Sequence, residues 1–180
     1  MNLVLIGYRG TGKSTVARLL AEQLGMEVVS LDQEVVRHAG CSVPDIVAEH
    51  GWPHFRDLES AVTKRFSERD NLIIDAGGGV VLRGENVKHL RHGGKLFWLQ
   101  ASVPVIVARI EGGTDRPALT AGKSFTEEVE EVLRDRTPLY AAAAHYRIDT
   151  DALSPDQVAA EVARFYKGAA SAARREEREA

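Results

Sequence analysis

The 180-residue sequence has one cysteine, no long hydrophobic segment and no excess of positive charge. Because Cys41 has no partner in the chain, an internal disulfide is excluded, and together with the lack of a basic leader this predicts a reducing, cytoplasmic environment. No stretch approaches the about 18 consecutive apolar residues of a membrane-spanning helix, so we expect no membrane partner. A net charge of −3 gives no indication of a nucleic-acid-binding surface.

Internal repeats and linker-like segments are also lacking. A chain of 180 residues with 44% hydrophobic content is typical of one domain with a single core. Residues 168–180 are small or charged and have no apolar face, so burial there would not offset the entropy of ordering them. We therefore expect a single domain over residues 1–167, followed by a flexible C-terminal tail.

Short apolar segments of strand length alternate with segments of helical periodicity. Strands are predicted at residues 2–6, 27–30, 72–75, 95–100 and 146–149. Helices are predicted over 13–24 with Gly25 as C-cap, over 104–110, and after the capping-box serines Ser124 and Ser154. Since helical crossovers join parallel strands, the pattern predicts an α/β fold with a five-stranded parallel sheet and helices on both faces.

A glycine-rich segment follows the first predicted strand. Residues Gly7 to Thr15 read Gly-Tyr-Arg-Gly-Thr-Gly-Lys-Ser-Thr, which fits the phosphate-binding P-loop pattern G-x-x-x-x-G-K-[ST]. We expect Lys13 to reach the β- and γ-phosphates and the Ser14 hydroxyl to bind Mg²⁺, at a helix N-terminus that favours anions. The pattern thus predicts a P-loop NTPase fold. The predicted nucleotide-binding residues are Gly10, Thr11, Gly12, Lys13, Ser14 and Thr15.

Residues 112–125 contain three glycines, one proline and two threonines, without helical or strand periodicity. This composition is typical of a surface loop. We expect these residues to form a mobile lid over the nucleotide site.

The sequence resembles shikimate kinases over nearly its whole length, from the P-loop to about Pro155. Five ordered patterns carry the resemblance in addition to the P-loop: Asp32-Gln33-Glu34, Phe55-Arg56-Asp57-Leu58-Glu59, Gly77-Gly78-Gly79, Asp115-Arg116-Pro117-Ala118-Leu119 and Arg136-Thr137-Pro138-Leu139-Tyr140. The resemblance implies a monomeric kinase that transfers the γ-phosphoryl group of ATP, with Mg²⁺, to the 3-hydroxyl of the small molecule shikimate.

The resemblance also implies a substrate-binding site. Arg56 and Arg136 match the family arginines that hold the shikimate carboxylate, a role suited to the planar guanidinium. Each has a simpler alternative: Arg56 an ion pair with Glu59, and Arg136 an ion pair with Asp135 or Glu131. Glycines Gly77, Gly78 and Gly79 match the segment whose backbone approaches the substrate.

Three further roles follow from the resemblance. Asp32 matches the carboxylate that orients the acceptor hydroxyl and accepts its proton, although it is also a candidate N-cap for the helix after Leu31. Arg116 matches the lid arginine that offsets charge on the transferred phosphoryl group, and its alternative is a solvated loop arginine. Arg109 and Pro155 match positions lining the adenine.

Two positions depart from the family pattern. The family usually has Asp-x-Asp after the second strand, where this chain has Ser30 and Asp32. Asp75, which ends the third predicted strand, fits the P-loop pattern of an apolar strand closing on a metal-binding acid, so we hypothesise that it takes over that role; otherwise it caps the glycine turn. The second departure is Val47, where the family commonly has phenylalanine. The nearby Trp52 and His54 are both candidates to fill the space.

Two alternative functions remain open on the sequence. One is another small-metabolite kinase, such as a gluconate kinase, which the pair Arg56 and Arg136 disfavours. The other is a nucleotide-dependent regulatory switch, which would need an exposed partner surface.

Overall fold

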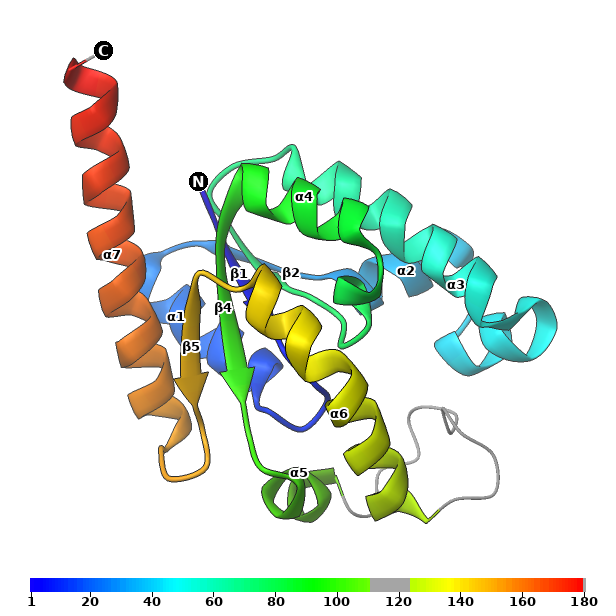
Figure 1. Ribbon diagram of the computed structural model, residues 1–180. Coiled ribbons are helices and arrows are strands. Elements are labelled where there is room, and N and C mark those ends of the chain that lie inside the picture. Colours follow the sequence, from blue (N-terminus) through cyan, green and yellow to red (C-terminus); the bar gives the residue numbers. More distant parts are fainter. Residues whose placement is uncertain (111–123, 180) are drawn as a thin grey trace.

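The computed structural model describes residues 1–110 and 124–179, with side chains up to residue 172 (Figure 1). Arg116 and nearly all of the predicted lid at 112–125 lie outside the described residues. Across the described ranges, every helix is too short or too polar to span a lipid bilayer.

The centre of the molecule is a five-stranded parallel sheet with the strand order β2-β3-β1-β4-β5. The strands are β1 (Asn2–Ile6), β2 (Glu27–Ser30), β3 (Leu72–Asp75), β4 (Gly94–Gln100) and β5 (Tyr146–Asp149). The predicted fold class and all five strands are confirmed, and β4 begins one residue earlier than predicted. Because all strands are parallel, their carboxyl ends meet at one edge of the sheet, the edge at which ligands bind in such folds.

Seven α-helices and one short 3₁₀ helix are present in the described residues. They are α1 (Lys13–Leu24), α2 (Leu31–Ala39), α3 (Val43–Ser67), η1 (Val80–Leu82), α4 (Gly84–Gly93), α5 (Val103–Ile110), α6 (Phe125–Ala143) and α7 (Pro155–Glu179). Helices α1 and α7 pack together on one side of the sheet, and α3, α4 and α6 lie on the other (Figure 1).

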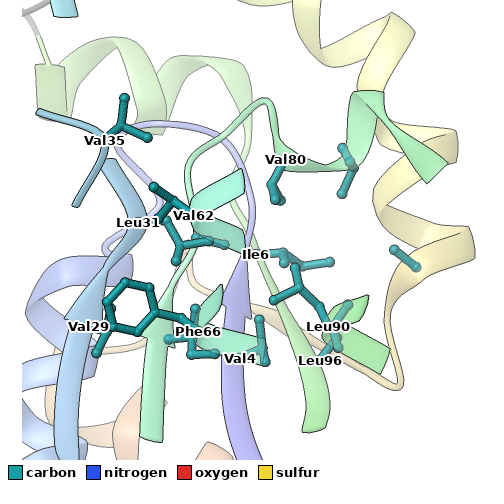
Figure 2. Packing of buried hydrophobic residues seen from close by; sticks show 14 of the residues in the cluster. Val4, Ile6, Val29, Leu31, Val35, Val62, Phe66, Val80, Leu90 and Leu96 are labelled. Carbon is teal, nitrogen blue, oxygen red and sulfur yellow. The ribbon is translucent and has the colours of Figure 1, made fainter. Parts of the chain in front are cut away.

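The two faces of β1 contribute to different hydrophobic clusters. Leu3 and Leu5 belong to the cluster formed with α1 and α7, whereas Val4 and Ile6 belong to the cluster formed with α3, α4 and α6. Figure 2 shows Val4 in this second cluster together with Phe66 of α3. A strand that is apolar on both faces is expected where helices cover both sides of a parallel sheet.

The predicted helix ends are confirmed. Ser124 and Glu127 form a complete capping box at the start of α6. At α7, the Ser154 backbone N–H donates to Gln157 Oε1 at 2.8 Å, and the Gln157 N–H donates to Ser154 Oγ at 3.2 Å. Helix α1 ends at Leu24 and has Gly25, with a φ of 65°, as its C-cap. These signals lie within a few residues of each helix end, which explains why the sequence alone reveals them.

Helix α7 extends into the segment for which the sequence predicts a flexible tail. The backbone is helical up to Glu179, and the flexibility of residues 168–180 stays a prediction. Alanine, arginine and glutamate dominate this segment and are strong helix formers, so α7 continues past Tyr166, the last buried residue among the described side chains.

Candidate active site

The P-loop connects β1 to α1 and contains three glycines with positive φ, of which Gly7 and Gly12 lie at its two ends. Gly7 has a φ of 142°, and a Cβ atom there would lie 2.3 Å from the carbonyl oxygen of Leu99. Gly12, the N-cap of α1, has a φ of 90°. Both are conformations that side chains disfavour, so the glycines allow the loop to turn directly from the strand into the helix.

Lys13 lies across this loop. Its side chain is buried, and Nζ donates to the carbonyl oxygens of Gly7 at 2.9 Å and Tyr8 at 3.0 Å. The ammonium group is therefore held at the turn whose backbone is expected to bind phosphate.

Ser14, the next residue, contacts the end of β3. Its Oγ donates to Oδ2 of Asp75 at 2.6 Å, and Asp75 is only 7% exposed. Asp75 also pairs in register with Ser30 of β2, so the two residues occupy adjacent positions on neighbouring strands. The carboxylate on β3 thus lies beside the strand position at which the family usually has its first aspartate.

A cavity of about 560 Å³ opens at the carboxyl edge of the sheet, around the P-loop. It contains most of the predicted nucleotide and metal residues. Its lining residues are Arg9, Gly10, Thr11, Gly12, Lys13, Ser14, Thr15, Val16, Ser30, Asp32, Asp75, Gly78, Arg109, Thr150, Leu153, Pro155 and Val158. Sequence reasoning did not single out Arg9, which occupies a variable position of the P-loop pattern, or Thr150, Leu153 and Val158, which lie in no motif.

Arg56 of α3 and Arg136 of α6 meet at the glycine segment after β3. Arg136 Nη1 donates to the carbonyl oxygen of Gly78 at 2.9 Å. A Cβ atom at Gly79 would lie 2.1 Å from Arg56 Nη1, so any side chain there would displace this guanidinium. Two arginines distant in sequence therefore lie at one short segment that also contributes Gly78 to the cavity.

Of the ion pairs proposed as simpler alternatives, the one for Arg56 is observed, whereas the candidate partners of Arg136 contact another arginine. Arg56 does form the ion pair with Glu59, with 2.8 Å between Nη1 and Oε2. For Arg136, the nearby acids pair instead with its neighbour: Arg134 lies 3.9 Å from Glu131 and 3.7 Å from Asp135.

Glu59 lies among these arginines and was not assigned a role from the sequence. It is 1% exposed, and its Oε1 has no hydrogen-bond partner among the described residues. Burial raises the pKa of Glu59, while the positive charges of Arg56, Arg136 and Arg83 oppose that rise. A Cβ atom at Gly77 would lie 3.0 Å from the free oxygen, which places it at the glycine segment.

Tyr140 supports the same segment from α6. Its hydroxyl donates to the carbonyl oxygen of Gly78, and its ring stacks on Trp98 with the centroids 5.8 Å apart. Burial raises the pKa of Tyr140 to about 12, so the hydroxyl keeps its proton. Glu59 is the last residue of the motif that contains Arg56, and Tyr140 is the last residue of the motif that contains Arg136. Their place in these motifs was the sequence signal that they support the arginine site.

Asp32 lies in the first turn of α2 and is not its N-cap. The cap is Ser30, whose Oγ accepts from the Gln33 backbone N–H at 3.4 Å, so the capping alternative for Asp32 is wrong. Asp32 lines the cavity, and its Oδ1 would lie 2.6 Å from a Cβ atom at Gly77. The carboxylate therefore lies at the boundary between the P-loop cavity and the glycine segment.

The aromatic residues near Val47 surround Arg56. Val47 itself is half-buried and packs on the adjacent hydrophobic cluster. Trp52 packs edge-on against Phe55, with ring centroids 5.6 Å apart, and the Arg56 guanidinium lies 5.3 Å and 5.1 Å from these two rings. His54 is exposed. Of the two candidates near Val47, Trp52 is therefore the one whose ring contacts Arg56.

A strand, a P-loop and a helix with a buried lysine, next to a glycine segment at which two arginines converge, are typical of a P-loop phosphotransferase that acts on a small metabolite. Comparison with known proteins specifies the family. A family model described as shikimate kinase matches residues 9–167. The shikimate kinase of Thermodesulfovibrio yellowstonii is 39% identical over 166 residues, covering 92% of this chain and 95% of that protein.

Two further relatives agree. The shikimate kinase of Nitratidesulfovibrio vulgaris is 44% identical over 151 residues, covering 82% of this chain and 86% of its own. The solved shikimate kinase of Acinetobacter baumannii, in complex with shikimate, superposes with a TM-score of 0.87 at 31% identity and covers 91% of each chain. The chain belongs to the shikimate kinase family.

Proposed function

We propose that this chain transfers the γ-phosphoryl group of MgATP to the 3-hydroxyl of shikimate, giving shikimate 3-phosphate and ADP. The observation that carries the proposal is the meeting of Arg56 and Arg136 at Gly78 and Gly79, beside the P-loop cavity. Family membership supplies the identity of the acceptor.

The P-loop binds the phosphates in this proposal. Backbone N–H groups of Gly10 to Thr15 surround the β-phosphate, and Lys13 exchanges its contacts with Gly7 and Tyr8 for phosphate oxygens. Arg109 and Pro155, which line the same cavity, bind the adenine.

Ser14 and Asp75 fit a magnesium site. Both offer oxygen atoms, the donors that this hard cation prefers, and these atoms are already within 2.6 Å of each other. Bound Mg²⁺ would neutralise charge on the β- and γ-phosphate oxygens. Asp75 supplies the carboxylate that Ser30 lacks, while Ser14 supplies the hydroxyl at the start of α1.

The acceptor is bound by charge and oriented by one carboxylate. Arg56 and Arg136 bind the shikimate carboxylate, and the backbone at Gly77, Gly78 and Gly79 leaves space for the ring. Asp32 orients the 3-hydroxyl. As that oxygen bonds to the γ-phosphorus and the bond to the β–γ bridging oxygen breaks, the hydroxyl proton passes to Asp32.

Three expectations stay predictions. Arg116, expected to offset charge on the transferred group, lies outside the described residues. The monomeric state and the cytoplasmic location follow from the sequence-based argument alone.

Measuring ADP release with MgATP and shikimate, with MgATP and gluconate, and with MgATP alone separates the candidate functions. We expect release to depend on shikimate. Equal release with gluconate would favour another metabolite kinase, and slow release unaffected by either acceptor would favour a regulatory switch.

A further inference from the structure

Arg109 of α5 is an exposed arginine that is nevertheless held by several hydrogen bonds. Its Nη2 donates to the carbonyl oxygen of Thr150 at 2.9 Å, and its Nη1 donates to Thr150 Oγ1 at 3.1 Å and to the Gly10 carbonyl oxygen at 3.3 Å. An exposed arginine normally samples many rotamers and loses that freedom when a ligand binds. Here both terminal nitrogens are fixed.

Thr150, the residue after β5, is itself rigidly placed. It is 2% exposed, and both its backbone N–H and its Oγ1 donate to the carbonyl oxygen of Gln100, at 2.8 Å and 3.0 Å. Because the single hydroxyl proton is directed at Gln100, only the lone pairs of Oγ1 are available to Arg109. The hydroxyl therefore connects the end of β4 to the guanidinium of Arg109.

The surroundings of this guanidinium suit a flat heteroaromatic ring. Arg109 and Thr150 line the cavity together with the apolar side chains of Leu153, Pro155 and Val158. A planar guanidinium stacks well on π systems, and apolar walls favour burial of a ring.

We propose that Thr150 is a positioning residue that fixes the Arg109 guanidinium against the base of the bound nucleotide and so sets the affinity for the nucleoside part of ATP. The inference rests on the proposed nucleotide site. Thr150 itself does not act on the phosphates, so its effect is confined to ligands that carry a base.

Calorimetric binding of ADP and of inorganic tripolyphosphate to the full chain tests this. Thr150→Val keeps the shape but loses the hydroxyl, and Thr150→Ser keeps the hydroxyl. We expect Thr150→Val to weaken ADP binding about tenfold, the loss typical of one hydrogen bond to a charged group. Tripolyphosphate binding should be unchanged, and Thr150→Ser should bind ADP as the unaltered protein does.

Arg109→Lys provides a second variant that does not alter a buried residue. It should weaken ADP binding to a similar degree, and adding Thr150→Val to it should cause no further loss. Equal loss for both ligands, full additivity of the two substitutions, or unchanged ADP binding by Thr150→Val would overturn the inference. If the unaltered protein binds tripolyphosphate but not ADP, the proposed nucleotide site itself is wrong, which is a distinct result.

Discussion

At the scale of single residues, the proposed magnesium site takes its acidic residue from β3, the strand beside the one that carries the first aspartate in the family pattern. Asp75 on β3 and Ser30 on β2 are register partners, so a carboxylate on either strand reaches the same edge of the sheet. In this chain the acid is on β3, where it accepts a hydrogen bond from Ser14 at 2.6 Å. The proposed magnesium site therefore needs a carboxylate at this edge of the sheet, which either strand could supply.

Asp75→Ser should raise the Mg²⁺ concentration needed for half-maximal activity by about tenfold or more, because it removes the only charged oxygen proposed for the site. Adding Ser30→Asp should lower this requirement again, because it places a carboxylate at the register partner of position 75. Aspartate also serves as an N-cap, so α2 should be retained. Titrating activity against Mg²⁺ in both variants checks this. An unchanged requirement in Asp75→Ser would remove Asp75 from the metal site.

Arg136 and Arg134 form a natural pair for testing the acceptor site. Arg136 is 9% exposed and bonded to Gly78, whereas the Arg134 side chain is 73% exposed. Arg136→Lys keeps the charge but loses the planar, bidentate donor geometry, so the KM for shikimate should rise about 10- to 100-fold. Arg134→Lys should leave it within about twofold, because exposed ion pairs contribute little. Steady-state kinetics with shikimate varied measures both, and equal effects would argue against the carboxylate-binding role.

At the scale of elements, the turn after β3 needs glycine at position 79 because the Arg56 guanidinium occupies the space of a side chain. A Cβ atom at Gly79 would overlap the flexible end of Arg56 and not the backbone, while a Cβ atom at Gly84 would meet nothing within 4 Å. Gly79→Ala should therefore displace Arg56 and raise the KM for shikimate about tenfold or more. The fold should persist.

Gly84→Ala is the matched control, because it adds the same methyl group at the start of α4. It should leave the KM unchanged and alter stability by less than about 1 kcal/mol. If Gly79→Ala instead lowers the melting temperature sharply without affecting the KM, the turn has a structural role only.

The start of β5 carries a pH-sensitive contact. His145 Nδ1 accepts a hydrogen bond from the Leu96 backbone N–H at 2.9 Å, and burial, followed by the nearby charges of Arg91 and Lys95, lowers the pKa of His145. A protonated imidazole cannot accept this bond. Since the folded-state pKa lies below the unfolded value of 6.5, the contact stabilises the protein above about pH 6.5 and is lost as the pH falls through the folded-state pKa.

His145→Asn retains an acceptor and does not titrate, so it should lose less stability between pH 7.5 and pH 5.5 than the unaltered protein. The difference should be under about 1 kcal/mol, because solvent screens this half-buried ring. Urea unfolding at both pH values measures it. A larger loss in His145→Asn would contradict the assignment.

At the scale of the whole molecule, the sequence predicted those features that depend on neighbouring residues. The P-loop, the strands and the capping boxes at Ser124 and Ser154 are encoded within short segments, and each was placed to within a residue or two. Their physical causes are local: backbone dihedrals, periodicity and caps.

Features that depend on distant contacts were not predictable in this way. The burial of Glu59 and the connection of Thr150 to Arg109 arise only when separate elements pack. The motif that ends in Glu59 does not reveal that burial, and no motif contains Thr150. Likewise, α3 continues through Gly51, whose φ of 80° kinks the helix, because residues on both sides are buried against the same cluster. The family resemblance supplied the pairing of Arg56 with Arg136, which spacing alone does not reveal.

The extent of the folded domain can be tested at α7. Among the side chains described up to residue 172, the last buried residue is Tyr166, which is 9% exposed and whose hydroxyl donates to the Met1 carbonyl oxygen at 2.7 Å. A chain ending at residue 167 keeps this contact and should match the full chain in its free energy of unfolding. A chain ending at residue 164 loses Phe165 and Tyr166 and should be less stable by about 2 kcal/mol or more, the effect expected from removing buried aromatic surface. Urea unfolding of the three chains compares them, and equal losses in both truncations would show that the helix beyond residue 167 contributes to the stability of the domain.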